Sequence, residues 1–398
     1  MHHEQLKKNK IRLLSSLAFA IGFLDAFFIY VLSTYFSVIS GSDNVGVFYF
    51  LGYSVVLLAL FYLQPLIRFM GKARVLYLAL GMSISAAALL AAASTPLVAI
   101  AAALLLIVAT NVIWVALDIL LESFSQDEVS GRIRGLHLTI MNAGLLLAPF
   151  LSLKMLDKYH YEGIFIVLVV GYSLVFIVAL LGFRTDNRVF QEKLRLRFTI
   201  RKMLQERNLL HIYLVSFGME FFYALMTVYT PIYLRSLQYS WDEIGIIFTV
   251  MLLPFVLFQY PLGVFADRYF GEKEMLFGSA AIAAAATLTL PFLGAGHVML
   301  WGGALFMTRV GIAGIELLRD SYFYKQIDGN DMDVIAFFRT TRPLSNIVAA
   351  LLSAAVLLYF PLQSMFILVA AALVFSLVET SFLQDTLSAR ERARALPH

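Results

Sequence analysis

Long apolar stretches follow one another along almost the whole chain, and they constrain its fold more than any other feature. A helix needs about 20 apolar residues to cross the ~30 Å hydrocarbon core of a bilayer. Hydrophobic residues make up 61% of the 398 residues and charged residues only 14%, whereas soluble domains have about 45–50% apolar and about 25% charged residues. The sequence therefore predicts an integral membrane protein.

Twelve stretches are long enough to cross a bilayer, and none shows the alternating pattern of a membrane barrel strand. We expect an all-α membrane protein with twelve transmembrane helices. The predicted spans are residues 12–39, 46–69, 75–94, 97–121, 132–153, 161–183, 209–235, 243–266, 274–293, 297–318, 333–359 and 362–383.

The distribution of Lys and Arg predicts the orientation of these spans. The two termini and the connections after the second, fourth, sixth and eighth spans hold 22 of these residues, whereas the opposite connections hold three, Lys154, Lys158 and Arg235. Because cytoplasmic loops carry an excess of Lys and Arg, both termini are predicted to be cytoplasmic. The basic stretch 184–208 has a mixed apolar face, which favours a tether over an amphipathic helix on the membrane surface.

The two halves of the chain repeat one polar pattern. Polar residues in the fourth and tenth spans recur at the same intervals of seven and four: Asn111, Asp118 and Glu122 in one, and Arg309, Glu316 and Asp320 in the other. Repeated halves are typical of one transporter architecture. We therefore expect two six-helix bundles, residues 1–183 and 209–398, joined by the cytoplasmic linker 184–208.

Three ionisable residues lie deep in the predicted spans. Asp25, Glu220 and Arg309 are each roughly 18–21 Å from the start of their span, near the middle of the hydrocarbon core. Such residues are costly in lipid and face a bundle interior or a water-filled cavity. The first, fourth, seventh and tenth spans are therefore expected to surround a polar path, and the third, sixth and ninth spans to face lipid.

These deep charges suggest proton coupling and substrate binding. Burial raises the pKa of a carboxyl and a nearby guanidinium lowers it, so Asp25 and Glu220 are candidates for proton uptake. Arg309 is expected to bind an anionic substrate or to lower the pKa of an acid; in the alternative, it is permanently paired with one acid and locks two helices together. Further candidate substrate-binding residues, for which helix packing is the alternative, are Asn111, Phe28, Phe222 and Tyr223.

A second charged group lies near the cytoplasmic ends of the fourth and tenth spans. Its members are Asp118, Glu122, Arg132, Glu316, Arg319 and Asp320. They are expected to form salt bridges between the halves that close the cytoplasmic side, or else to be solvated helix ends. Exposed pairs contribute only about 0–1 kcal/mol each, but a few such pairs can bias a two-state equilibrium.

A motif between the eighth and ninth spans resembles a known family. Residues 263–273 read G-V-F-A-D-R-Y-F-G-E-K and are similar to the G-x-L-A-D-R-x-G-R-K loop of the major facilitator superfamily, with one extra residue. In the first half, Gly71 and Lys72 match, but Arg68 stands where the family has an aspartate. The resemblance implies a cytoplasmic latch containing Asp267 and Arg268; the other matching positions are Gly263, Gly271 and Lys273.

The family resemblance implies a secondary active transporter that works by rocking of the two bundles. We expect proton-coupled export of small organic or amphiphilic compounds; the alternatives are a proton-driven nutrient uptake symporter and a non-transporting sensor with a transporter-like body. The absence of cysteine excludes thiolate metal sites and cysteine nucleophiles, and a net charge of +4 gives no reason to expect a nucleic-acid partner. No catalytic motif, metal site or cofactor site is recognisable.

The expected partners are the lipid bilayer, a small-molecule substrate and protons or another coupling ion. The protein is expected to be a multi-pass protein of the cell membrane that works as a monomer.

Overall fold

The computed structural model describes residues 2–124, 130–183, 205–266, 271–327, 334 and 337–384. Within these ranges the regular secondary structure is helical throughout, as the apolar pattern predicts. The chain forms two compact units, residues 1–192 with 240–245 and residues 193–239 with 246–398. The linker predicted at 184–208 lies outside the described residues up to residue 204.

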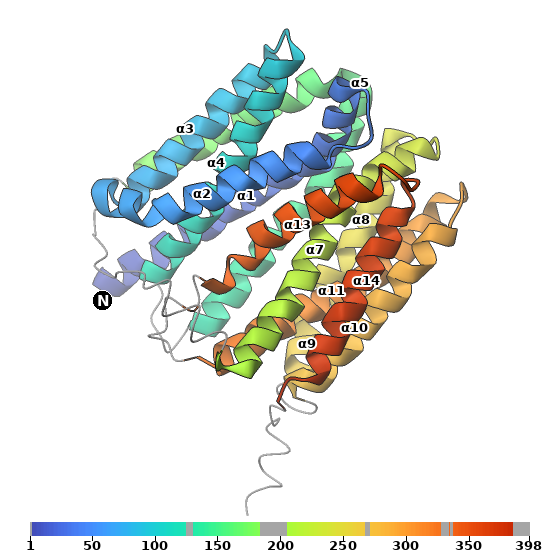
Figure 1. The fold of residues 1–398 in the computed structure, drawn as a ribbon. Coiled ribbons are helices and arrows are strands. Elements are labelled where there is room, and N and C mark those ends of the chain that lie inside the picture. The colour runs from blue at the N-terminus through green and yellow to red at the C-terminus, as the bar shows by residue number, and fades with distance from the viewer. Residues whose placement is uncertain are drawn as a thin grey trace, which may run out of the picture. The chain divides into compact units, whose positions relative to one another are not determined.

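The described residues of the first unit form the helices α1 (His2–Ser40), α2 (Gly46–Met70), α3 (Lys72–Ala91), α4 (Pro96–Phe124) and α5 (Ser130–Gly182) (Figure 1). The helix α5 covers two predicted spans. His160 interrupts it with φ 55° and ψ −166°, at the position where the sequence predicts the connection between 132–153 and 161–183.

The helices of the second unit are α7 (Arg207–Ser236), α8 (Trp241–Leu257), α9 (Gln259–Phe265), α10 (Glu272–Thr289), α11 (Val298–Lys325), α13 (Thr341–Val356) and α14 (Ser364–Ser381), with a 3₁₀ turn at Leu290–Phe292. The first residues of α8 belong to the first unit by their contacts.

Ten helical segments among the described residues are long and apolar enough to cross a membrane. One of them, Ala143–Gly182, has 40 residues and includes the interruption at His160, and α13 is a shorter apolar helix of 16 residues. The chain is therefore a multi-pass membrane protein. The count of twelve spans and the cytoplasmic position of the termini stay predictions.

The predicted span 243–266 is divided into α8 and α9, and proline explains the position of the break. Pro261 has no N–H to donate to the carbonyl of Leu257, four residues earlier, and its ring would clash with that carbonyl in a continuous helix. Accordingly, α8 ends at Leu257 and α9 begins at Gln259.

Glycines allow close helix packing in each unit. A Cβ atom on Gly144 of α5 would lie 2.4 Å from the carbonyl oxygen of Phe19 in α1, and one on Gly311 of α11 would lie 2.5 Å from the backbone nitrogen of Ala283 in α10. Small residues at helix contacts let transmembrane backbones approach closely. The pairs α1–α5 and α10–α11 therefore pack through backbone contacts at these positions.

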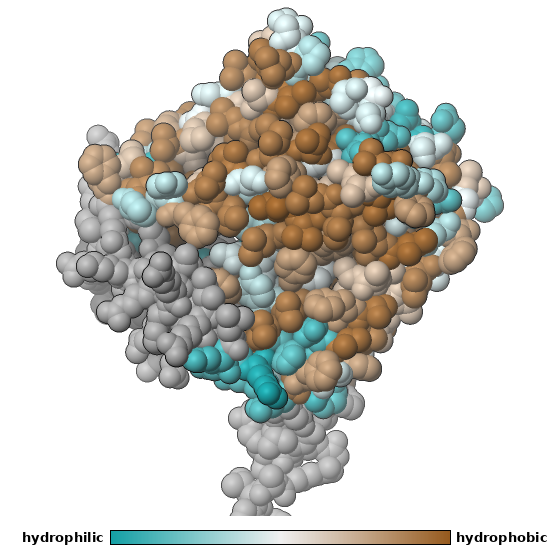
Figure 2. Space-filling model, in the orientation of Figure 1, coloured by the Kyte–Doolittle hydropathy of each residue, from teal (hydrophilic) through white to brown (hydrophobic). Residues whose placement is uncertain are grey.

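The outer faces of α3 and of the second part of α5 are apolar and exposed. Leu78 is 44% exposed, Leu174 59% and Leu181 70%. Figure 2 shows apolar side chains over most of the face in view, with hydrophilic residues gathered mainly at its margins. Such surfaces are suited to lipid contact, in agreement with the expectation that the third and sixth spans face lipid.

Candidate functional site

The second unit holds a polar cluster between α7 and α11. Helical periodicity places residues three, four and seven apart on one face. The polar residues at these intervals are Ser216, Glu220 and Tyr223 on α7, and Arg309, Glu316 and Arg319 on α11. We call these six residues the α7–α11 cluster.

An ion pair joins the two helices of this cluster. Nη1 of Arg319 lies 3.2 Å from Oε1 of Glu220, and the two side chains are only 11% and 12% exposed. Arg319 also donates a hydrogen bond to the hydroxyl of Ser216 and lies 3.4 Å from the carboxylate of Asp320. Removing one partner of a buried pair costs about 3–5 kcal/mol, because the other charge stays buried. The pair therefore fixes α7 against α11.

Arg309 lies against aromatic rings. Its guanidinium carbon is 4.5 Å from the ring centre of Phe222 and 5.5 Å from that of Tyr223, and the residue is 1% exposed. A desolvated cation–π contact of this kind contributes about 2 kcal/mol. The structure thus brings together three of the predicted substrate-binding residues.

Glu316 faces the start of α9. Its Oε2 accepts a hydrogen bond of 3.0 Å from the side-chain amide of Gln259, the first residue after the helix break. Broken helices line substrate and ion sites in secondary transporters. Gln259 was not predicted from the sequence; its position two residues before Pro261 was the available signal.

The first unit has a related contact between α1 and α4. The indole nitrogen of Trp114 donates a hydrogen bond of 3.0 Å to Oδ2 of Asp25. Trp114 was not identified from the sequence, although it lies three residues after Asn111 and so on nearly the same helix face. The Asn111 amide donates to the carbonyl of Ile107 in its own helix, and Phe28 is 3% exposed.

The Asp25–Trp114 and Glu220–Arg319 contacts join corresponding helices of the two units. In each unit, the acid in the first helix binds a side chain of the fourth helix: Asp25 in α1 binds Trp114 in α4, and Glu220 in α7 binds Arg319 in α11. The repeated halves thus share an acid-to-helix connection. The donor is the uncharged indole of Trp114 in the first unit and the charged guanidinium of Arg319 in the second.

The predicted charged group near the helix ends is only partly described. The side chains of Asp118, Glu122 and Arg132 lie outside the described residues. Arg319 is bonded to Glu220 of its own unit, and its role in a gate between the halves stays a prediction.

The predicted latch is also partly described. Asp267 and Arg268 lie outside the described residues, whereas Gly263 lies in α9 and Lys273 in the first turn of α10. Gly271 precedes α10 with a φ of 75°, and Gly71 precedes α3 with a φ of 88°, so the same left-handed turn begins both helices. The repeat predicted from the polar residues extends to this turn.

Apolar spans held together by buried polar contacts define a multi-pass membrane protein with a transporter-like bundle. The chain belongs to the major facilitator superfamily, because the family model described as "Major Facilitator Superfamily" matches residues 14–318. A comparison with curated protein sequences gave no match.

Two solved transporters share the fold. A mutant of nucleoside transporter NupG has 15% identity and a TM-score of 0.70, and the match covers 94% of this chain and 99% of that one. A mutant of peptide transporter POT in complex with alafosfalin has 13% identity and a TM-score of 0.70, with 93% of each chain covered. These similarities establish the fold.

Proposed function

We propose that this protein is a proton-coupled secondary active transporter of small organic compounds in the cell membrane, working by alternating access. Its family membership and apolar helices support transport across a bilayer. The observation that carries the proton coupling is the α7–α11 cluster, in which two carboxyls lie next to different kinds of partner.

Glu316 is the carboxyl in this cluster that we add to the two predicted coupling residues, Asp25 and Glu220. The Gln259 amide that binds Glu316 has a donor NH₂ group and an acceptor oxygen, so it can hydrogen-bond to either protonation state of the carboxyl. Protonation of Glu220, in contrast, removes the charge that binds Arg319. We infer that Glu316 takes up a proton while the ion pair is intact, and that Glu220 is protonated when the pair opens.

The aromatic side chains beside Arg309 support a small organic substrate with an anionic or aromatic group. Phe222 and Tyr223 contact the guanidinium, and Tyr223 is also stacked on Phe255 at 6.4 Å. We propose export as the direction. Uptake is a second candidate because the similar structures are transporters of a nucleoside and of a peptide by their names.

The experiment begins with a thermal-shift screen of nucleosides, dipeptides and anionic amphiphiles on the purified protein. The compound that gives the largest shift is then used with proteoliposomes in two assays, accumulation driven by a pH gradient and counterflow without a gradient. Glu316→Gln should lose gradient-driven accumulation by at least about fivefold, the lower end of typical coupling between two ligands, and keep counterflow.

Asp25→Asn and Glu220→Gln test the other two carboxyls in the same way. Glu379→Gln is the matched control, because Glu379 is a half-buried acid of the same unit that binds His211 on α7, away from the cluster. A wild-type response to the gradient in all three acid variants would reject proton coupling. Binding of the compound without movement of label would favour the sensor.

Arg309 is tested separately in folded variants. Arg309→Lys keeps the charge but loses the planar guanidinium that lies on the two rings, so substrate affinity should fall in this variant and more strongly in Arg309→Ala. Unaltered affinity in Arg309→Ala would leave Arg309 a helix-packing residue.

A further inference from the structure

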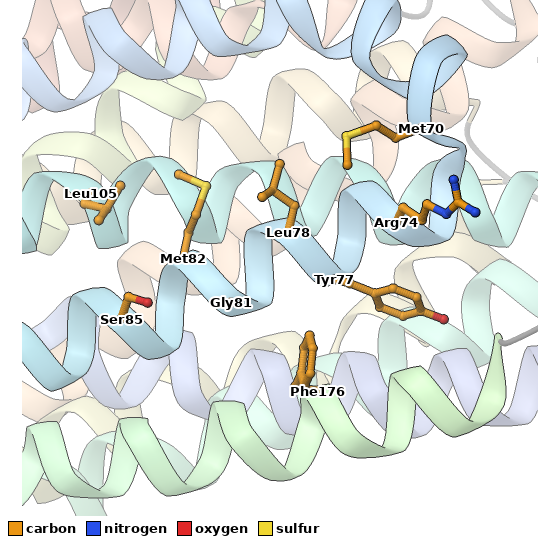
Figure 3. A pocket seen from close by; sticks show the side chains of 9 residues that line it. All are labelled: Met70, Arg74, Tyr77, Leu78, Gly81, Met82, Ser85, Leu105 and Phe176. Atoms are coloured by element: carbon orange, nitrogen blue, oxygen red, sulfur yellow. The ribbon is translucent and has the colours of Figure 1, made fainter.

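An open groove of about 600 Å³ lies on the first unit, between α3, α4 and the second part of α5 (Figure 3). Its lining includes Leu78, Met82, Leu105 and Phe176, which are apolar. Figure 3 shows Arg74 at one end of the groove and Ser85 with Leu105 at the other. The groove therefore has a cationic end and an apolar body.

The length of this groove fits one leaflet of a bilayer. Arg74 is the third residue of α3, and Ser85 follows eleven residues later, which is about 16 Å along a helix. Half of a ~30 Å hydrocarbon core is about 15 Å. With Arg74 at the membrane surface, the groove runs from the headgroup region to the middle of the bilayer.

The floor of the groove is open at Gly81. A Cβ atom on this glycine would meet nothing within 4 Å. Two aromatic residues form a wall beside it: the ring of Tyr77 lies edge-on to that of Phe176 at 6.1 Å, and its hydroxyl donates to the carbonyl of Ala179 at 3.3 Å. These contacts with α5 fix the position of Tyr77, so this wall of the groove is formed before any ligand binds.

We propose that this groove binds one anionic phospholipid, with its phosphate on Arg74 and one acyl chain along Gly81 toward Ser85. Arg74 is exposed and can approach a lipid headgroup, and an arginine near a membrane surface attracts anionic lipids. The apolar body fits an acyl chain and excludes a polar solute. The site requires only that α3 spans a bilayer, and it is independent of the transport proposal.

The other half of the repeat lacks this charge. Gly71 and Gly271 begin equivalent turns, and the third residue after them is Arg74 in α3 but Glu274 in α10. An acid at this position repels a phosphate. The repeat therefore supplies a matched control, and anionic lipid selection is expected on α3 alone.

The test uses the full chain, purified in detergent, stripped of lipid and analysed by native mass spectrometry. Phosphatidylglycerol and phosphatidylcholine with the same acyl chains are added in equal amounts, and the ratio of the two retained lipids is measured. The wild type should prefer phosphatidylglycerol. In Arg74→Gln this preference should fall about fivefold, as expected for the loss of one cationic contact.

The substitution Gly81→Leu tests the part of the groove that is proposed to hold the acyl chain. The open space at Gly81 accommodates the new side chain, which fills the groove, so the total number of retained lipid molecules should fall by one per protein. The matched controls are Glu274→Gln and Gly278→Leu in α10, where a Cβ on Gly278 also meets nothing within 4 Å. Both should retain lipid as the wild type does.

A third measurement distinguishes binding of a phospholipid from binding of a soluble phosphate compound. Glycerol phosphate at the same concentration should displace none of the bound phosphatidylglycerol, because it has no acyl chain. The proposal is overturned if Arg74→Gln keeps the wild-type lipid ratio, if Gly81→Leu retains as much lipid as the wild type, or if glycerol phosphate displaces the lipid.

Discussion

Single side chains decide what kind of contact joins the first and fourth helices of each unit. The indole of Trp114 is an uncharged group that can only donate, so it gives the Asp25 carboxyl a hydrogen bond without a counter-charge. Arg319 brings a full charge to Glu220 in a site that is almost closed to solvent. The same helix pair is thus joined by a hydrogen bond in one unit and by an ion pair in the other.

The ion pair should show strong coupling between its two partners. Arg319→Gln removes the cation from the buried Glu220 carboxylate and should destabilise the protein by about 3–5 kcal/mol. The double variant Glu220→Gln/Arg319→Gln leaves no buried charge at either position and should recover part of this loss. Thermal unfolding midpoints of the purified proteins in one detergent measure both effects.

Asp320→Asn is the control for this cycle. Asp320 lies 3.4 Å from Arg319, but its side chain is 46% exposed, so its loss should cost at most about 1 kcal/mol. If the effects of Glu220→Gln and Arg319→Gln simply add in the double variant, the two residues are not an energetic pair.

At this scale the sequence predicted which charged residues are buried better than it predicted their partners. Glu220 and Arg309 were identified by their depth within apolar spans, because a charged side chain is costly in lipid and therefore faces the bundle interior or a water-filled cavity. Spacing along one helix does not determine how that helix is rotated and shifted against another. The partner of Glu220 is therefore Arg319, one of the residues assigned to the gate, and the contact of Arg309 with Phe222 was not predicted.

At the scale of the helix, glycines allow close packing and prolines can break the helix. The sequence alone does not show which prolines break a helix. The helices α2, α5 and α7 continue past Pro65, Pro149 and Pro231, whereas the segment containing Pro261 is divided next to the proline. Neighbouring helices and side chains often satisfy the groups that a proline frees in a membrane. The apolar stretches were therefore predictable, but the break at Phe258 required the structure.

Glycines on α11 give a prediction at the scale of one helix contact. Gly311→Ala would place a Cβ 2.5 Å from the backbone of Ala283 and Ser279, so α10 and α11 must move apart. We expect a loss of about 1–3 kcal/mol, as for other overpacked sites.

Gly303→Ala, on the same helix, is the matched control because its Cβ meets nothing within 4 Å. This substitution should be neutral or stabilise the helix by up to about 1 kcal/mol, since alanine is the better helix former. Both are measured as shifts of the thermal midpoint. Equal shifts for the two variants would show that helix propensity, and not the α10–α11 contact, determines the effect.

At the scale of the whole molecule, the two units begin a helix with the same backbone turn and differ in the charge that follows it. Gly71 and Gly271 form the same turn, yet Lys72 follows the first and Glu272 the second. Glu272 is 1% exposed, forms an ion pair with Lys325 and accepts a hydrogen bond of 3.0 Å from Ser321. The polar intervals predict a repeat because equivalent helix faces keep the same spacing, whereas the sign of the charge at one position can differ between the two units.

Because each unit has its own buried core, cutting the chain between the units should leave both folded. A protease site inserted between residues 184 and 204 falls in the connection that joins α5 to α7, whereas one inserted between residues 328 and 333 falls inside the second unit, between α11 and α13. After cleavage at the first site, circular dichroism should show the helical content and the thermal midpoint of the uncut protein.

Cleavage at the second site is the control. It should lower the thermal midpoint, because the loss of one covalent connection adds the entropic cost of bringing α13 and α14 back to α7 and α10. A fall in helical content after the first cut alone would mean that the two units depend on the linker to stay folded.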